Sequence, residues 1–375
     1  MAEKRLIITC MKNEGPFILE WVAYHRSIGF NDFLVFTNDC DDGTVEMLDT
    51  LQGHGILTRM DNPYLELEGG FNPQKGALHY ADGLEQVNQA TWILISDVDE
   101  YVNIHVGDGT LDALFEATGN PDLVSMQWRL FGNSDVHGFR DEWVTEQFDH
   151  CAPEFCPSPV QAWAVKTMFR TDVGRFVAGR FKKLGVHRPL DPGRGATANS
   201  KWVDGCGRPV LKKFIGGGWR FGTHSAGYDV VTMNHYAIRS AESFVVKRDR
   251  GRVNHVDRDQ GLAYWLRMNF NMERDDSIAR HLGRAREEYD RLLELRGMKT
   301  RHAAAVKAHR AKIRELLERP DGKAFLDEIT SSRMQLISRH LNLLSRDMFS
   351  EGPQTIPPAI FERVEQVPDL LAVQG

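Results

Sequence analysis

The sequence lacks several features that would assign it to a protein class at once. It has only five cysteines among 375 residues, and an odd number does not favour a disulfide framework. No apolar run approaches the ~18 residues that a bilayer-spanning helix needs. The first apolar run, residues 6–10, is too short for a signal-peptide core and has no small-residue cleavage site after it. These absences predict a cytoplasmic protein.

A strong excess of one charge is also missing. The net charge is −6, which gives no reason to expect a nucleic-acid partner. Residues 301–319 carry dense charge, and a basic face there would allow peripheral contact with the inner face of a membrane. The favoured interpretation of these residues is a solvated helix face.

Two familiar ligand-binding patterns are absent. Residues 11–15, Met-Lys-Asn-Glu-Gly, follow the first predicted strand in place of a glycine-rich dinucleotide fingerprint. His150, Cys151, Cys156 and Cys206 are residue types that bind zinc, but their spacing matches no common zinc pattern. A zinc site at these residues is therefore the disfavoured alternative.

The sequence does contain a regular alternation of strand and helix patterns. Hydrophobic residues make up 42% and charged residues 26%, as in soluble globular proteins, and the length allows one large domain or two ordinary ones. Short apolar strands alternating with amphipathic helices predict an α/β fold with a mainly parallel sheet and helices on both faces. The predicted strands are residues 6–10, 32–37, 56–59, 92–95, 122–130, 164–170 and 230–238, and the predicted helices include 15–28, 45–51, 74–88, 109–117 and 240–250.

Composition changes along the chain predict three regions. Residues 1–255 form the α/β domain, in which residues 133–230 are irregular and rich in Gly, Pro, His and aromatics, as in an acceptor-binding or lid insert. Residues 256–350 are predicted to form a helical C-terminal region. Residues 351–375 carry four prolines and are predicted to be a flexible tail.

Three carboxylates follow the predicted strand at residues 92–95. They are Asp97, Asp99 and Glu100, and such closely spaced like charges repel one another. Ligands of open α/β sheets bind just beyond the carboxyl ends of the strands. The cluster therefore predicts a site for Mn²⁺ or Mg²⁺, which prefer oxygen ligands. The alternative is a helix N-terminus with solvated acids.

The motifs together resemble a known family. The chain is similar to family-2-like glycosyltransferases of the GT-A fold, and most similar to the branch related to glycosyltransferase family 92. The likeness covers roughly residues 5–130 and 230–252. The residues that carry it are Lys12-Asn13-Glu14, Glu20-Trp21, Tyr24-His25, Asn38 to Thr44, Gln74-Lys75, Asp97-Val98-Asp99-Glu100-Tyr101, Trp128, Phe131-Gly132, Asn234-His235-Tyr236, Ser240, Glu242, Phe244, Lys247, Arg250 and Gly251.

This resemblance implies a GT-A type, Rossmann-like sheet with a helical C-terminal extension. It also implies a metal-dependent transfer, with inversion, of a sugar from a nucleotide-sugar donor. The expected nucleotide is UDP, and the acceptor is a glycan, a lipid-linked sugar or a small molecule. A divalent cation stabilises the departing diphosphate as a Lewis acid.

Roles for individual residues follow from the same resemblance. Asp99 is the expected metal ligand, with Asp97 on the ribose or near the metal, and His235 either completes the metal shell or is structural. Lys247 and Arg250 lie three residues apart on one helix face, suited to a diphosphate, although alone they would be taken for surface charges. The remaining expected donor contacts are Asn13, Glu14, Asp39, Gln74 and Lys75, for which turn chemistry is the alternative.

An inverting transfer needs a general base. The resemblance places it in the loop after residue 130, where Glu142 is preferred to Asp141. Trp128 or Trp143 could form a platform for an acceptor sugar, although core packing is the commoner use of tryptophan.

Two other functions remain open. A metal-dependent phosphohydrolase could use Asp97 and Asp99 as nucleophile and acid, but that chemistry normally places the motif on the first strand of its domain. A non-catalytic module that binds nucleotide sugars or glycans is the other alternative.

Overall fold

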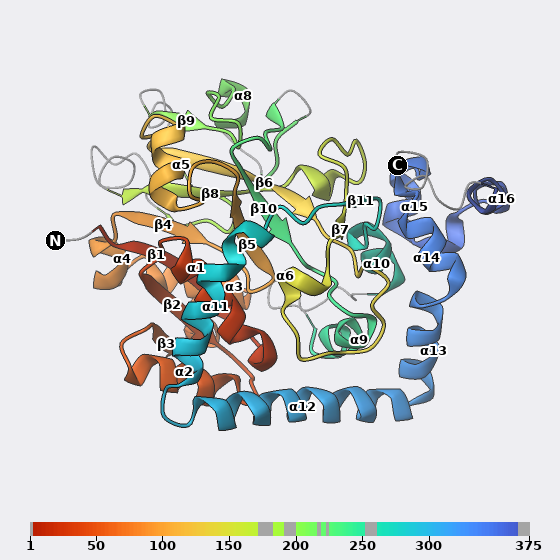
Figure 1. The fold of residues 1–375 in the computed structure, drawn as a ribbon, viewed down its shortest axis with the longest axis horizontal. Coiled ribbons are helices and arrows are strands. Elements are labelled where there is room, and N and C mark those ends of the chain that lie inside the picture. The colour runs from red at the N-terminus through yellow and green to blue at the C-terminus, as the bar shows by residue number, and fades with distance from the viewer. Residues whose placement is uncertain are drawn as a thin grey trace.

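The structure is a computed structural model that describes residues 3–171, 183–190, 200–215, 219–222, 225–251 and 261–366. A nine-stranded sheet runs through its centre in the order β3-β2-β1-β4-β8-β6-β10-β5, with β9 beside β6 (Figure 1). The strands are β1 (Arg5–Met11), β2 (Asp32–Thr37), β3 (Thr58–Asp61), β4 (Trp92–Ile95), β5 (Glu100–Ile104), β6 (Leu123–Leu130), β8 (Val165–Arg170), β9 (Trp202–Val203) and β10 (Val231–His235).

The sheet is parallel in its first half and mixed in its second. β3, β2, β1 and β4 pair in parallel, as the sequence predicts. β8 is antiparallel to both β4 and β6, and β5 is antiparallel to β10. The burial pattern of a single strand does not depend on the direction of its neighbours. Hydrophobic periodicity therefore could not predict that β5 and β8 are antiparallel to the strands beside them. The α/β class is confirmed.

Alternating side chains of the strands point to opposite faces of the sheet, and each face has its own layer of hydrophobic core. In β1, Ile7 and Met11 pack on the face covered by α1 (Ile18–Ser27), whereas Leu6 and Ile8 pack on the opposite face. Alternation of this kind lets a central strand bury both of its faces. The first face also carries α2 (Thr44–Gly53), α5 (Leu111–Ala117) and α11 (Ala279–Leu293), and the second carries α3 (Pro73–Ala81) and α4 (Glu85–Gln89).

The C-terminal helices build a further core against the same domain. In Figure 1, α12 (Met298–Glu318) runs along the lower edge, and α13 (Pro320–Ile329) rises from its end. The helices that share this core are α9 (Ala241–Asp249), α10 (Leu262–Met268), α12, α13, α14 (Ser332–Ser338), α15 (Arg346–Glu351) and α16 (Pro358–Glu365). None of the helices within these described ranges combines the length and hydropathy that a membrane-spanning segment requires.

Several predicted boundaries differ from the structure. The predicted helix 74–88 is two helices, α3 and α4, because the chain turns at residues 82–84. The predicted division at residue 255 does not separate two cores, since Leu282 and Ala285 of α11 pack in the same core as α1. The region predicted to be mostly helical from residue 258 also contains β11 (Glu273–Arg274), which pairs with β7 (His150–Cys151).

The predicted flexible tail is largely structured. α16 buries Phe361 and Val364, and a 3-10 helix, Pro353–Thr355, precedes it. Pro353 and Pro358 lie at helix starts, where proline is well tolerated. Residues 367–375 of the tail, residues 258–260, and parts of the predicted insert lie outside the described residues.

Buried histidines make folding sensitive to acid. Burial lowers the pKa of His25 from 6.5 to about 3, against the hydrogen bond between Nδ1 and the Trp21 carbonyl. Burial likewise lowers the pKa values of His187, His281 and His309 to about 4. Below pH 6.5 these histidines are therefore protonated in the unfolded chain but stay neutral in the folded chain. As a result, the free energy of unfolding decreases as pH falls from about 6.5 to 4.

Replacing His25 by phenylalanine should flatten this pH dependence. His25 lies against Trp21 and Tyr101, so a ring of similar size keeps the packing. Between pH 7.5 and 5, the wild-type free energy of unfolding should fall by about 2 kcal/mol more than that of His25→Phe. Urea unfolding at both pH values measures this. Exposed His54→Gln is the control, and an equal slope in His25→Phe and wild type would contradict the prediction.

Candidate active site at the carboxyl edge of the sheet

The loops that follow β1, β2 and β4 meet at one edge of the sheet. The amide of Asn13 donates to Asp41 Oδ1 at 2.7 Å, and the Asp41 N–H donates back to Asn13 Oδ1 at 2.9 Å. Asn13 and Asp39 have positive φ angles of 52° and 49°, a conformation that Asn and Asp adopt more readily than most residues. The predicted donor-binding loops are therefore adjacent and tied to each other.

A buried lysine joins two of the three predicted acids. Lys166 of β8 is fully buried, and its Nζ lies 3.2 Å from Asp97 Oδ2 and 3.2 Å from Glu100 Oε2. Burial lowers the pKa of Lys166, but Asp97 and Glu100 outweigh it and leave the pKa raised, so the lysine stays charged. The charge relieves the repulsion that the sequence predicted for this cluster.

Glu100 also fixes the turn that carries the motif. Its Oε2 accepts the Asp97 N–H at 2.8 Å and the Ser96 hydroxyl at 3.1 Å. It therefore orients the turn from within the core and does not face a ligand. Asp97 remains about one-third exposed and accepts a second hydrogen bond from Gln74 Nε2 at 3.0 Å.

Sequence reasoning missed Lys166. Its signal was a lysine placed inside an otherwise buried strand, Val-Lys-Thr-Met-Phe-Arg. Lysines are almost never fully buried unless paired. The sequence did not reveal that its partners are Asp97 and Glu100, because only the tertiary structure places β8 next to β4.

Asp99 faces two cationic or proton-binding groups. Lys247 Nζ lies 2.6 Å from Asp99 Oδ2, and His235 Nε2 lies 3.5 Å from Asp99 Oδ1. Burial raises the pKa of Asp99, but Lys247 and His235 together hold it well below its usual range. The Tyr236 N–H donates to the Asp99 carbonyl at 2.8 Å, which fixes β10 against the motif. The predicted trio of Asp99, His235 and Lys247 thus meets.

A second ion-pair group lies beside this one. Glu14 is buried and contacts Arg239 Nη1 at 2.9 Å and Arg250 Nη2. Although burial raises the Glu14 pKa, Arg250 and Arg239 lower it further, so the carboxylate stays ionised. Arg250 also donates to the carbonyl of Asn13 at 2.7 Å. Arg239 was not predicted, and it links the two groups by donating to the Val98 carbonyl at 3.3 Å.

The remaining predicted residues divide into two sets. Trp128 lies at the site, with its ring centroid 4.2 Å from that of His235. Asp39 and Lys75 are on the exposed rim, where Lys12 contacts Asp39 at 3.5 Å and Asn72 Oδ1 caps α3 by accepting the Lys75 N–H.

Glu142, Asp141 and Trp143 are held elsewhere. Glu142 is exposed and pairs with Arg140, and Asp141 contacts His302 of α12. Trp143 packs on Tyr289 and Arg286 of α11. The loop is drawn to these helices because Glu20 of α1 accepts the N–H groups of Val144 and Thr145. These contacts give no support to Glu142 or Asp141 as the base, or to Trp143 as a sugar platform.

The residues present fit a divalent cation that shares its shell with a substrate. Buried Asp99 Oδ1 has no hydrogen-bond partner among the described residues, and it faces His235 Nε2. Within the same part of the chain, no three His, Cys, Asp or Glu side chains converge as a complete metal cage. Mg²⁺ and similar ions commonly take one or two protein ligands and complete their shell with phosphate and water. Asp99 and His235 meet that requirement.

The disfavoured zinc site gains no support. The five cysteines are free thiols, and Cys151 Sγ accepts a hydrogen bond from Arg129 Nε at 3.2 Å. Burial raises the pKa of the Cys151 thiol to about 12, so it is protonated near neutral pH.

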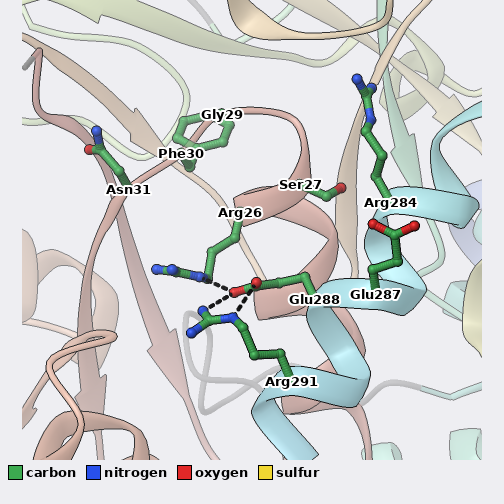
Figure 2. Close-up of a pocket in the computed structure, with 9 residues that line it drawn as sticks. All are labelled: Arg26, Ser27, Gly29, Phe30, Asn31, Arg284, Glu287, Glu288 and Arg291. Carbon is green, nitrogen blue, oxygen red and sulfur yellow. Dashed lines mark hydrogen bonds and ion pairs between the residues drawn. The ribbon is translucent and has the colours of Figure 1, made fainter.

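A pocket of about 540 Å³ lies away from the carboxylates. It is lined by the end of α1 and by α11, and residues 26–31 in its wall lead into the start of β2. This is the amino edge of the parallel strands. Figure 2 shows Arg26 and Arg291 both turned toward Glu288, with Arg291 Nη2 at 2.6 Å from its Oε1. The charges in this pocket largely neutralise one another, and none of the predicted site residues reaches it.

The variant Lys166→Met should destabilise the fold by leaving the buried Glu100 carboxylate and the partly exposed Asp97 carboxylate without their cation. Removing one partner of a buried ion pair typically costs about 3–5 kcal/mol. The double variant Lys166→Met/Glu100→Gln should recover part of that loss, because one of the uncompensated charges is then gone. Urea unfolding of the wild type, both single variants and the double variant measures the coupling. Additive losses would contradict a direct interaction.

Comparison with known proteins gives one family. The model of glycosyltransferase family 92 matches residues 6–155. A glycosyltransferase family 92 protein of Oryza sativa subsp. japonica is 27% identical over 123 residues, which cover 32% of this chain and 20% of that protein. One of Arabidopsis thaliana is 28% identical over 147 residues, covering 37% of this chain and 24% of its own.

A third relative shows the same limited overlap. A glycosyltransferase family 92 protein of Ricinus communis is 31% identical over 96 residues, or 25% of this chain and 15% of that protein. The chain thus spans about a fifth of the length of the curated relatives it matches. The matched stretch contains β1 to β6 and the acidic motif. Over residues 6–155, the predicted resemblance to glycosyltransferase family 92 is confirmed.

Proposed function

We propose that this protein is a glycosyltransferase that uses a nucleotide-sugar donor at the carboxyl edge of the sheet. The observation that carries the proposal is the meeting of Asp99, His235 and Lys247 beside the β1 and β2 loops, within a stretch that matches glycosyltransferase family 92. Fold alone would not suffice, because one fold serves many functions. The chemistry of this edge is suited to a diphosphate.

The proposed donor lies across three parallel strands. The nucleoside contacts the loops of Asn13 and Asp39, for which UDP is the expected nucleotide. The diphosphate reaches Lys247 on α9 and Arg250 directly after it, whose side chains already contact Asp99 and Glu14 at this edge. Lysine and arginine side chains donate charge-assisted hydrogen bonds, which stabilise the negative charge that develops on a departing diphosphate.

Asp99 and His235 would hold a Mn²⁺ or Mg²⁺ ion, which supplies Lewis-acid stabilisation of the leaving group when bound. Lys247 meanwhile balances the Asp99 charge, and its flexible stem allows it to turn from the carboxylate to a phosphate oxygen. Gln74 and Lys166 keep the partly exposed Asp97 carboxylate in one orientation for the donor. The transferred sugar then faces β6, β8 and β10, and inversion is expected from the resemblance.

Ligand-induced thermal shifts should show metal and nucleotide acting together. UDP with Mn²⁺ should raise the melting temperature more than the sum of the separate shifts, because ligands that bind only the folded state stabilise it. GDP and a phosphate monoester, each with and without Mn²⁺, are the comparison arms. A shift with the phosphate monoester alone would favour the phosphohydrolase alternative. Absence of any metal-linked nucleotide shift would overturn the proposal.

The variant Asp99→Asn should lose the metal-linked part of nucleotide binding. The amide keeps the shape of the carboxylate but removes its charge, so Mn²⁺ should strengthen UDP binding by at most a few-fold instead of on the order of a hundredfold. Calorimetric titration of UDP with and without Mn²⁺ measures the difference. Glu116→Gln, which removes an exposed carboxylate of α5, is the matched control. An unchanged Mn²⁺ effect in Asp99→Asn would refute the ligand assignment.

A further inference from the structure

Three aromatic rings form a row beside the acidic motif. The ring centroid of His187 lies 5.7 Å from that of Trp128 and 5.8 Å from that of Trp219. The ring centroid of Trp128 also lies 4.2 Å from that of His235. Ring contacts therefore connect the row to a proposed metal ligand.

Backbone hydrogen bonds fix this row onto β8. The Val165 N–H donates to the Trp219 carbonyl at 3.1 Å, and the Thr167 N–H donates to the His187 carbonyl at 2.9 Å. His187 Nδ1–H donates to the Val165 carbonyl at 3.1 Å. This last bond sets the tautomer, since a carbonyl can only accept. Nε2 of His187 is left as a hydrogen-bond acceptor.

The row lies within electrostatic reach of the acidic motif. Burial lowers the pKa of His187 to about 4, and the positive charge of Lys166 lowers it as well. Lys166, which follows Val165 in β8, is the residue that pairs with Asp97. The aromatic row and the carboxylates thus belong to one edge of the sheet.

Core packing is the ordinary explanation for such rings, but the burial of these three differs from that of core aromatics. Trp21, Trp92 and Trp265 are almost wholly buried. Trp128, His187 and Trp219 are each only partly buried. Arg220 lies over the Trp219 ring at 5.4 Å, which steadies that ring without enclosing the row. Partly exposed, immobilised rings beside polar groups are typical of small-ligand sites.

The strand order indicates which part of a substrate would reach them. The loops expected to hold the nucleoside follow β1 and β2, and the acidic motif follows β4. β8 and β6, which carry the row, are the next strands in the sheet. A nucleotide-sugar donor whose nucleoside lies at β2 and whose diphosphate lies at β4 therefore has its sugar next to the aromatic row. In a glycosyl transfer, the transferred sugar lies at that place, beside the acceptor.

We propose that Trp128, His187 and Trp219 form a sugar-binding subsite, in which a pyranose ring stacks on the indoles and a hydroxyl donates to His187 Nε2. The proposal rests on the proposed function, because it places the subsite beside the diphosphate position. The C–H face of a sugar is apolar and suits an aromatic ring, and its hydroxyls need a few fixed polar partners. The sugar belongs either to the donor or to the acceptor, which share this chemistry.

The test compares sugar-bearing probes with a probe that carries no sugar beyond the ribose. Wild type, Trp219→Ala and His187→Asn are titrated calorimetrically with Mn²⁺ and UDP, UDP-glucose, UDP-galactose and UDP-N-acetylglucosamine. A second series titrates cellobiose, lactose and chitobiose into the protein saturated with UDP and Mn²⁺. His187→Asn keeps a donor for the Val165 carbonyl while removing the ring. Tyr80→Ala, which removes a partly exposed ring on α3, is the matched control.

The subsite predicts that at least one sugar-bearing probe binds the wild type and binds both variants about tenfold more weakly, while UDP affinity stays unchanged. Loss on the nucleotide sugars assigns the subsite to the donor, and loss on the disaccharides assigns it to the acceptor. Unchanged affinities in the variants, or no sugar-dependent binding by the wild type, would overturn the subsite alone. Failure of the wild type to bind UDP would instead overturn the proposed function. Melting temperatures of the variants show whether they are folded.

Discussion

The ion pairs of Lys166 with Asp97 and Glu100 are the constraint on which the site depends. Three carboxylates at the end of a buried strand cannot remain ionised and ordered unless a cation accompanies them. Lys166 supplies that charge from β8, a strand that runs against its neighbours. The turn from β4 to β5 can then keep Glu100 in the core and Asp97 at the surface. The mixed second half of the sheet is therefore part of how the motif is held.

Charge compensation continues outward from that pair. Asp99 is matched by Lys247, and Glu14 is matched by Arg239 and Arg250, so Asp97, Asp99, Glu100 and Glu14 each have a basic partner. Such a network is ordered before a substrate arrives, which lowers the cost of organising charged groups around a diphosphate. Arg239, Lys247 and Arg250 lie just before, on and just after α9, so this segment can exchange its contacts with protein carboxylates for contacts with a ligand.

The sequence allowed much of this edge to be predicted, because the chemistry there is local. Asp97, Asp99 and Glu100 share one turn, Lys247 and Arg250 share one helix face, and the resemblance supplied His235. The prediction was poorer wherever the partner came from a distant segment. No local pattern pointed to Arg239. Lys166 stood out as a lysine inside an otherwise buried strand, but the sequence did not show which acids it pairs with. Glu142 and Asp141 lie in the expected loop, but α11, α12 and Glu20 draw that loop toward the helices.

The sequence by itself determined the α/β alternation, the strand that ends in acids and the face of α9 that carries the basic residues, because periodicity and spacing encode each of these within a few turns. Tertiary structure alone decided the direction and position of β8, the integration of α11 with the first core, and the folding of α16 against its neighbours. Those features depend on which surfaces meet between segments that are not neighbours in the sequence. No local sequence pattern specifies such a pairing, because the same hydrophobic side chains could be buried in several arrangements. Packing and charge across the whole fold select one of them.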